Sequence, residues 1–136
     1  MPAHSDKFPW PSYYGHFDFF ENAMRRHNRV QNLEAHGGGR YTLTLSDGRN
    51  LTAFICECYS YGVAEYYETV EKIGQVDVVV ISSNWCHYSS DVKLHCRNEK
   101  VGVFDIKGIM AALNNKDFWL YLDEWEEKKF KEKGWI

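Results

Sequence analysis

Residues 51–81 read LTAFICECYSYGVAEYYETVEKIGQVDVVVI, and this stretch decides the fold class. Its first part, Leu51 to about Tyr59, is largely apolar on both faces, which predicts a central strand covered on both sides. Its middle part repeats apolar side chains at three- and four-residue steps between Gly62 and Gly74, which predicts an amphipathic helix. Residues 76–81 contain the apolar run Val78 to Ile81, which is typical of a buried parallel strand. A strand, a helix and a strand in this order indicate an α/β sheet that is parallel at its centre.

The residues before this stretch predict a helix and a hairpin. Asp18 begins a sequence that resembles a capping box, so we expect a helix to start near it. Apolar side chains continue at helical spacing, and the glycines at 37–39 would end this helix in a left-handed C-cap. Residues 41–45 alternate in polarity as a strand does, and Asp47 with Gly48 marks a tight turn into the central strand.

The residues after the central stretch alternate between helices and a short strand. Ser89 or Ser90 is placed to cap a helix that runs to about residue 100. Residues 101–104 predict a short strand, and Asp105 can cap the helix that follows it. Residues 116–133 predict a last helix whose apolar face carries large aromatic side chains.

Length and composition favour one domain that folds without disulfides. The chain has 136 residues, of which 44% are hydrophobic, and a formal charge of −3. We therefore expect one α/β domain over residues 1–136, with a mixed sheet flanked by helices, an irregular arm over 1–15 and a C-terminal helix within 116–136. The N-terminus lacks the apolar region of a signal peptide, and no apolar run approaches the ~20 residues of a membrane helix. These features predict a cytoplasmic protein with no membrane partner and with reduced cysteines.

Two acidic residues are the best candidates for chemistry. Glu57 interrupts an apolar strand, where a carboxylate is costly unless it has a partner, and Tyr59 lies on the same strand face. Asp47 precedes Glu57 in the turn before that strand, so the two carboxylates could hold one Mg²⁺ whose other ligands are water and phosphate. Such a metal activates water and stabilises charge on a scissile phosphate. The alternative for Asp47 is an ordinary hairpin turn.

The order of elements and the spacing of these acids resemble the PD-(D/E)XK, or restriction-endonuclease-like, superfamily, with a nearer likeness to its Mrr-type and Holliday-junction-resolvase-type members. In that family a helix precedes a hairpin, an acid lies on the second strand, and an acid-x-lysine motif lies on the third. Residues 54–59, FICECY, stand where that motif would be, while residues 77–84 and 101–107 resemble the later strands. The resemblance implies a restriction-endonuclease-like fold, nucleic acid as a partner and Mg²⁺ as a cofactor. The resemblance also implies that the metal ligands are Asp47, Glu57 and Glu21.

One position departs from the family pattern. Tyr59 stands where the family has the lysine that holds the nucleophilic water or stabilises charge, and a neutral tyrosine does neither well. Lys72 on the following predicted helix is the nearby candidate to replace that lysine. The resemblance therefore implies a catalytic set of Asp47, Glu57, Tyr59 and Lys72 in which metal-dependent nuclease activity is impaired or lost.

Cysteine and histidine also recur together along the sequence. Zinc takes four such ligands in a tetrahedron, but their spacing here matches no standard zinc motif. Cysteine is among the most buried residue types without any ligand role, so buried thiols are favoured over a zinc site. The residues concerned are Cys56 with Cys58, Cys86 with His87, and His95 with Cys96.

Two further sets of polar residues are candidates for ligand contacts. Arginines on the first helix and around the hairpin could hold phosphates, although a solvated surface is their commoner role. The loop after the buried strand lies at the carboxyl end of the sheet, where α/β proteins usually bind ligands. The arginines are Arg25, Arg26, Arg29, Arg40 and Arg49, and the loop residues are Ser82, Ser83, Asn84 and Trp85.

These observations leave three functions open. The first is a small nucleic-acid-binding or nucleic-acid-processing protein with an impaired nuclease site, of a kind that suits viruses, mobile elements, and defence or counter-defence systems. The second is a non-enzymatic inhibitor or adaptor that docks a protein partner or a second copy through Trp10 or Trp135. The third is an α/β domain that binds a nucleotide ligand at the loop over residues 82–85.

Overall fold

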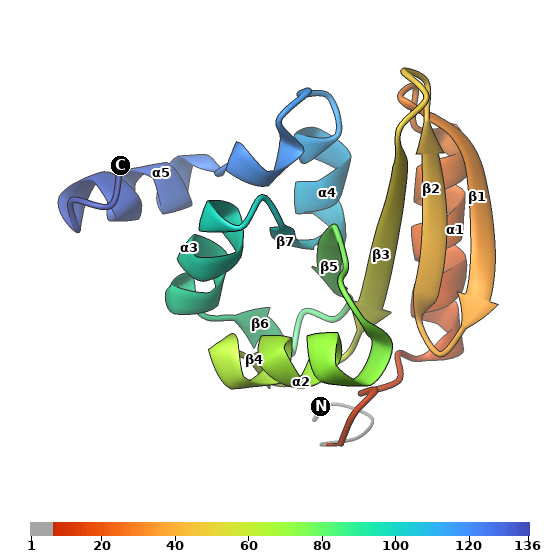
Figure 1. Cartoon of the computed structure of the whole chain (residues 1–136), viewed down its shortest axis with the longest axis horizontal. Coiled ribbons are helices and arrows are strands. Elements are labelled where there is room, and N and C mark those ends of the chain that lie inside the picture. The colour runs from red at the N-terminus through yellow and green to blue at the C-terminus, as the bar shows by residue number, and fades with distance from the viewer. Residues whose placement is uncertain (1–6) are drawn as a thin grey trace.

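Five strands in the order β1-β2-β3-β5-β7 form the central sheet of the computed structural model, which describes residues 7–136 (Figure 1). β1 pairs antiparallel with β2 and β2 with β3, whereas β3, β5 and β7 run parallel to one another. The strands are β1 (Val30–Gly37), β2 (Arg40–Leu45), β3 (Asn50–Cys56), β5 (Val78–Ile81) and β7 (Gly102–Asp105). Two short strands, β4 (Ser60–Tyr61) and β6 (His87–Tyr88), pair in parallel as a separate ribbon.

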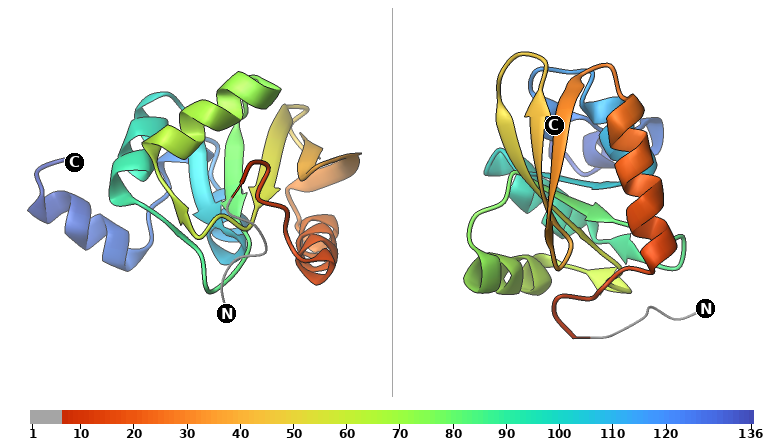
Figure 2. Two further views of the ribbon diagram at one scale, coloured as in Figure 1. Left: turned by 90° about the horizontal axis from the view of Figure 1, so that it is seen from below. Right: turned by 90° about the vertical axis from the view of Figure 1, so that its right-hand side faces the viewer.

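Helices cover both faces of the sheet (Figure 2). One face packs against α1 (Tyr14–Arg26) and α4 (Ile106–Ala112), and the other packs against α2 (Val63–Ile73) and α3 (Ser90–Asn98). The mixed sheet therefore lies between two helical layers, as the alternation of strands and helices predicted.

Side-chain alternation explains why the sheet separates two apolar cores. In β3, Ala53 and Ile55 face the core under α1, while Phe54 and Cys56 face the core under α2. All four residues of β5 are buried, which agrees with a parallel strand covered on both faces. A continuous apolar run over residues 78–81 thus marks the centre of the molecule.

Several predicted elements are confirmed. The hairpin turn lies at Asp47 and Gly48, and Gly74 ends α2 with a positive φ of 85°. Ser89 caps α3 by accepting from Val92 N at 3.0 Å, and Asp105 caps α4 by accepting from Gly108 N at 2.6 Å. These signals are local, since a cap needs only the right side chain within three residues of the helix start.

The first predicted helix is wrong in extent. Helix α1 begins at Tyr14, inside the predicted irregular arm, and ends at Arg26, and residues 30–37 form strand β1 instead of continuing the helix. The glycines at 37–39 all have positive φ and make the turn between β1 and β2 rather than a helix C-cap. Pairing with β2 overrides the weak helical spacing of this segment, because its partly buried Leu33 packs against the core under α1.

The last predicted helix is also wrong. Residues 116–133 contain a short 3₁₀ helix, η1 (Phe118–Leu120), and a separate helix, α5 (Glu124–Glu132). Asp123 starts α5 because its side chain accepts from Glu126 N at 2.8 Å. The aromatic side chain of Trp125 is 67% exposed rather than part of an apolar face, and Phe130 is the buried anchor of α5.

Two smaller predictions concern the ends of strands and of the chain. The central strand ends at Cys56, so Glu57 and Tyr59 follow it rather than lie within it. Of the predicted arm, residues 1–6 lie outside the described part of the chain. Within residues 7–136, no helix combines the length and the apolar character needed to cross a membrane.

Candidate functional site

Glu57 is a buried carboxylate at the carboxyl edge of the parallel strands. It follows β3 directly and is 3% exposed. Its Oε1 lies 2.9 Å from His16 Nδ1 and accepts a long hydrogen bond from the backbone N–H of Tyr13 at 3.4 Å. The start of α1 therefore supplies the partners that a buried carboxylate requires.

Asp47 does not lie near Glu57. It occupies the turn that precedes β3, whereas Glu57 lies beyond the opposite end of that strand. The Asp47 carboxylate accepts from Arg49 N at 3.0 Å and from Arg49 Nε at 2.9 Å, and the backbone bond is the main reason that its pKa is lowered. The two acids cannot share one Mg²⁺ in this arrangement.

The antiparallel register explains why β2 offers no second acid beside Glu57. Gly39 lies opposite the end of β3, and its carbonyl oxygen accepts from Ile55 N at 2.8 Å. Strand β2 itself carries no acidic side chain, and the backbone N–H of Glu57 donates to the carbonyl oxygen of Trp10 at 2.7 Å. Within residues 7–136, no three His, Cys, Asp or Glu residues come together as a metal-binding group.

The other residues of the implied catalytic set are dispersed. Glu21 on α1 accepts from Tyr41 Oη at 2.7 Å and lies 3.5 Å from Arg25 Nη1. Tyr59 is exposed and its ring packs edge-on against His87, with ring centroids 6.1 Å apart. Lys72 is exposed in the last turn of α2, which covers the face of the sheet opposite to α1. None of them has a described contact with Glu57.

The four cysteines are free and buried. Burial raises the pKa of Cys58 and Cys96 to about 12, and burial with the nearby Glu57 charge raises that of Cys86 to about 11. The thiolate is the nucleophilic form of cysteine, so these thiols are inert near neutral pH.

The loop after β5, a predicted site of ligand contacts, borders a cavity over part of its length. Ser82, Ser83 and Asn84 follow β5 and border a cavity of about 530 Å³ at the carboxyl edge of the sheet, together with His16. Trp85 is not among the residues that line it and is 57% exposed. Asp105 and Lys107 contribute from the end of β7 and the start of α4.

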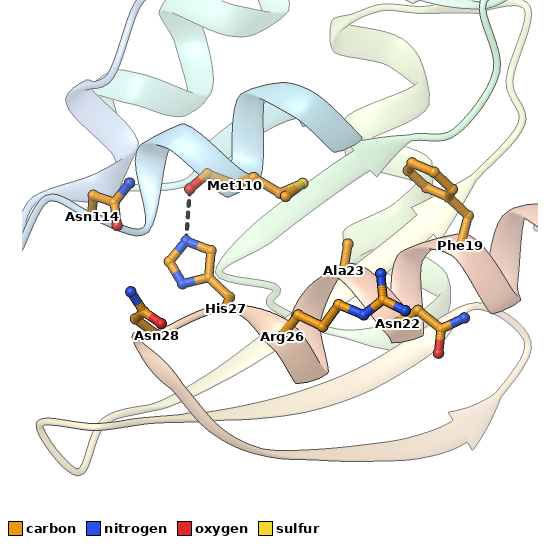
Figure 3. Close-up of a pocket in the computed structure, with 8 residues that line it drawn as sticks. All are labelled: Phe19, Asn22, Ala23, Arg26, His27, Asn28, Met110 and Asn114. Carbon is orange, nitrogen blue, oxygen red and sulfur yellow. Dashed lines mark hydrogen bonds between the residues drawn. The ribbon is translucent and has the colours of Figure 1, made fainter.

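This cavity is the first of three that follow one another along α1 and α4. Phe19 is shared with a second cavity of about 490 Å³, in which His27 Nε2 lies 2.7 Å from the carbonyl oxygen of Met110 (Figure 3). Asn114 is shared between the second cavity and a third of about 330 Å³ beside the turn at Asp47. We call the three together the α1–α4 groove.

The charge of the α1–α4 groove is opposite to that of the whole chain. Five cationic side chains line it against two carboxylates, and one of these, Asp47, is paired with Arg49 at 2.9 Å. The chain as a whole carries −3. The cationic residues are Arg26, Arg29, Arg49, Lys107 and Lys116, and the carboxylates are Asp47 and Asp105.

Three of the five arginines proposed as phosphate contacts therefore lie together. Arg25 instead borders a small cavity between α1 and β1, and Arg40 opens β2 at the glycine turn. Sequence reasoning did not single out His16, Phe19, Lys107 or Lys116. Nothing in the local pattern distinguishes these residues, because the groove forms only when α4 packs beside α1.

Comparison with known proteins does not extend these observations. No protein-family model matches the chain, and neither the curated proteins nor the solved structures contain a significant match.

Proposed function

We propose that the protein binds single-stranded nucleic acid along the α1–α4 groove. The observation that carries this proposal is the excess of cations in a groove on an otherwise acidic chain. Lys and Arg side chains spaced along a groove hold a phosphate backbone without reading its sequence. The 13 residues of α1 give the groove a length of about 20 Å, which suits a short single strand.

An aromatic side chain at the middle of the groove supports a single strand over a duplex. Phe19 separates the first cavity from the second, and its side chain is 61% exposed. Exposed aromatic rings stack on unpaired bases, whereas the bases of a duplex are already stacked on one another. Phosphates would then contact Arg26 and Lys107 on either side of this ring.

We also propose that the fold is a restriction-endonuclease-like one with an altered active site. Support comes from the order of α1, the β1–β2 hairpin, β3, α2, β5, α3 and β7, which matches the order of elements in that superfamily. Glu57 stands just after the third strand, where the family motif begins. The absence of a second acid on β2 and the presence of Tyr59 two residues after Glu57 support the loss of the metal-dependent chemistry.

Fluorescence anisotropy with labelled single-stranded oligonucleotides tests the binding proposal. The double variant R29Q/K116Q should weaken binding about tenfold, because two exposed charge contacts each contribute up to about 1 kcal/mol. The matched control is the double variant K72Q/K128Q, which removes two exposed lysines outside the groove and should bind as the wild type does. Equal weakening in both variants would contradict a role for the groove.

A protein segment is the second candidate for the same groove. Phe19 and Met110 are exposed large apolar side chains in its middle cavity, and such side chains also anchor protein partners. Salt distinguishes the two ligands, because phosphate contacts weaken steeply with ionic strength and apolar docking does not. A nucleotide ligand confined to the cavity at Ser82 would instead raise the melting temperature without depending on Arg29 or Lys116.

A further inference from the structure

The pair formed by Glu57 and His16 has the geometry that prepares a histidine for proton transfer. Glu57 is buried, whereas the His16 side chain is 35% exposed and lines the cavity at the carboxyl edge of the sheet. An ionised carboxylate can only accept hydrogen bonds, so the 2.9 Å contact places the proton of neutral His16 on Nδ1. The lone pair then belongs to Nε2, which is the basic nitrogen of the ring.

The neighbouring serine does not complete a serine-hydrolase triad. Ser82 Oγ lies 3.4 Å from His16 Nδ1, the same nitrogen that faces Glu57, and 2.8 Å from Ser12 Oγ. In a triad the serine and the carboxylate contact opposite nitrogens of the histidine. Ser82 is therefore not placed to be the nucleophile that His16 activates.

We infer that His16, held by Glu57, is the general base of a metal-independent cleavage of single-stranded RNA. This inference rests on the proposed binding of nucleic acid in the α1–α4 groove. RNA carries its own nucleophile, the 2′-hydroxyl next to the scissile phosphate, so a base alone can start the reaction. DNA lacks that hydroxyl and is not a substrate for this chemistry.

The step balances without an added oxidant, metal or co-reactant. Nε2 of His16 takes the proton of the 2′-hydroxyl, and the 2′-oxygen forms a bond to phosphorus. The bond between phosphorus and the 5′-oxygen breaks, and that oxygen takes a proton from solvent. The products are a 2′,3′-cyclic phosphate and a 5′-hydroxyl end. Lys107, in the same cavity, supplies positive charge for the phosphate oxygens.

The experiment follows cleavage of a labelled single-stranded RNA in the presence of a chelator, with ends identified by mass spectrometry. We expect cutting with cyclic phosphate ends in the wild type and a loss of about 100-fold in His16→Ala. The matched control, His36→Ala, removes a surface histidine of β1 outside the groove and should cut as the wild type does. Purifying all proteins identically separates the activity from a contaminating ribonuclease, which His16→Ala would not remove.

Glu57→Gln tests the positioning role of the carboxylate. The amide oxygen can still accept from Nδ1 of His16, so the fold is retained while the negative charge is lost. We expect kcat to fall with KM unchanged, because a role confined to holding the groove in shape would raise KM instead. A melting temperature close to that of the wild type confirms that the variant is folded.

Binding and cleavage are measured on the same sequence, with a DNA version for binding alone. Binding of the oligonucleotide without metal-free cleavage of RNA would overturn this inference and leave the proposed function standing. Cleavage that persists in His16→Ala would overturn it as well. Absence of binding to either strand would remove the proposed function and this inference together.

Discussion

At the scale of single residues, Lys93 on α3 is the most unusual charge in the protein. It is 1% exposed, donates from Nζ to the carbonyl oxygen of Val103 at 2.6 Å, and lies 3.9 Å from the centre of the Phe104 ring. Burial lowers its pKa to about 8, although the carboxylate of Glu126 partly opposes this. The folded protein therefore holds this ammonium at a cost near neutral pH.

Replacing Lys93 by Met should stabilise the protein below pH 8 and lose that advantage as pH rises. Below pH 8 the lysine is protonated in both states, so the cost is constant. Between about 8 and 10.5 the unfolded chain binds more protons than the folded one, so the wild type gains stability relative to the variant, by up to about 3 kcal/mol. Urea unfolding of both proteins from pH 7 to 10.5 measures this difference.

The comparison needs a control because the cysteines, whose pKa burial raises in the folded protein, ionise in that range once the chain is unfolded. Lys72→Met changes an exposed lysine of α2 and should leave the pH dependence of unfolding unchanged. A Lys93→Met variant whose stability relative to the wild type stays constant from pH 7 to 10.5 would contradict the lowered pKa of Lys93.

Single residues also show what sequence could and could not predict about the site. Glu57 stands out in the sequence because a carboxylate in an apolar strand needs a partner, and the structure supplies one in His16. The partner itself could not be predicted, since His16 lies 41 positions earlier on a helix whose start was misplaced. The sequence around Asp47 is compatible with both a hairpin turn and a metal site. Only the register of β2 and β3 distinguishes these two interpretations.

At the scale of elements, the β1–β2 hairpin depends more on Gly39 than on the neighbouring Gly38. Gly39 has a φ of 85°, and a Cβ at this position would overlap the backbone oxygen of Ile55. Gly38 has a φ of 64°, but its Cβ would meet open space. Gly39→Ala should therefore disturb the pairing of β2 with β3, whereas Gly38→Ala should bring only the strain of a left-handed backbone, about 1 kcal/mol.

Thermal and urea unfolding of the two alanine variants tests this difference. We expect Gly39→Ala to lower the free energy of unfolding by at least about 2 kcal/mol, because a backbone overlap adds to the same left-handed strain. Equal losses in the two variants would mean that the hairpin shifts to accommodate the new methyl group. In that event Gly39 would not constrain the pairing of β2 with β3.

Elements were predictable where their signals are local. The caps at Ser89 and Asp105, the glycine that ends α2 and the apolar run of β5 are each contained within a few residues. Strand β1 was missed because its outer face is polar and its identity comes from pairing with β2. The last predicted helix is divided before α5, which begins after its cap Asp123. The first part was not predictable from local signals, because Phe118 in η1 is buried through packing against the core under α1.

At the scale of the whole molecule, an acidic chain with a cationic groove should bind its ligand in a salt-dependent way. Chain charge and groove charge have opposite signs, so we expect a polyanion to bind where the five cations gather. Each phosphate contact releases condensed counterions, which reduces log K by about 0.7 for each tenfold rise in salt on a single strand. Five contacts would give a slope of about −3.5.

The slope also distinguishes which cations touch the strand. In R29Q/K116Q two contacts are removed at the end of the groove beside Asp47, so the slope should fall in magnitude by about 1.4. Anisotropy titrations of the wild type and this variant between 50 mM and 200 mM salt, about the range over which such contacts are resolved, measure both slopes. A wild-type slope near zero would show that phosphates do not hold the ligand and would favour an apolar protein segment at Phe19. An unchanged slope in the variant would instead confine the strand to the half of the groove that contains His16 and Lys107.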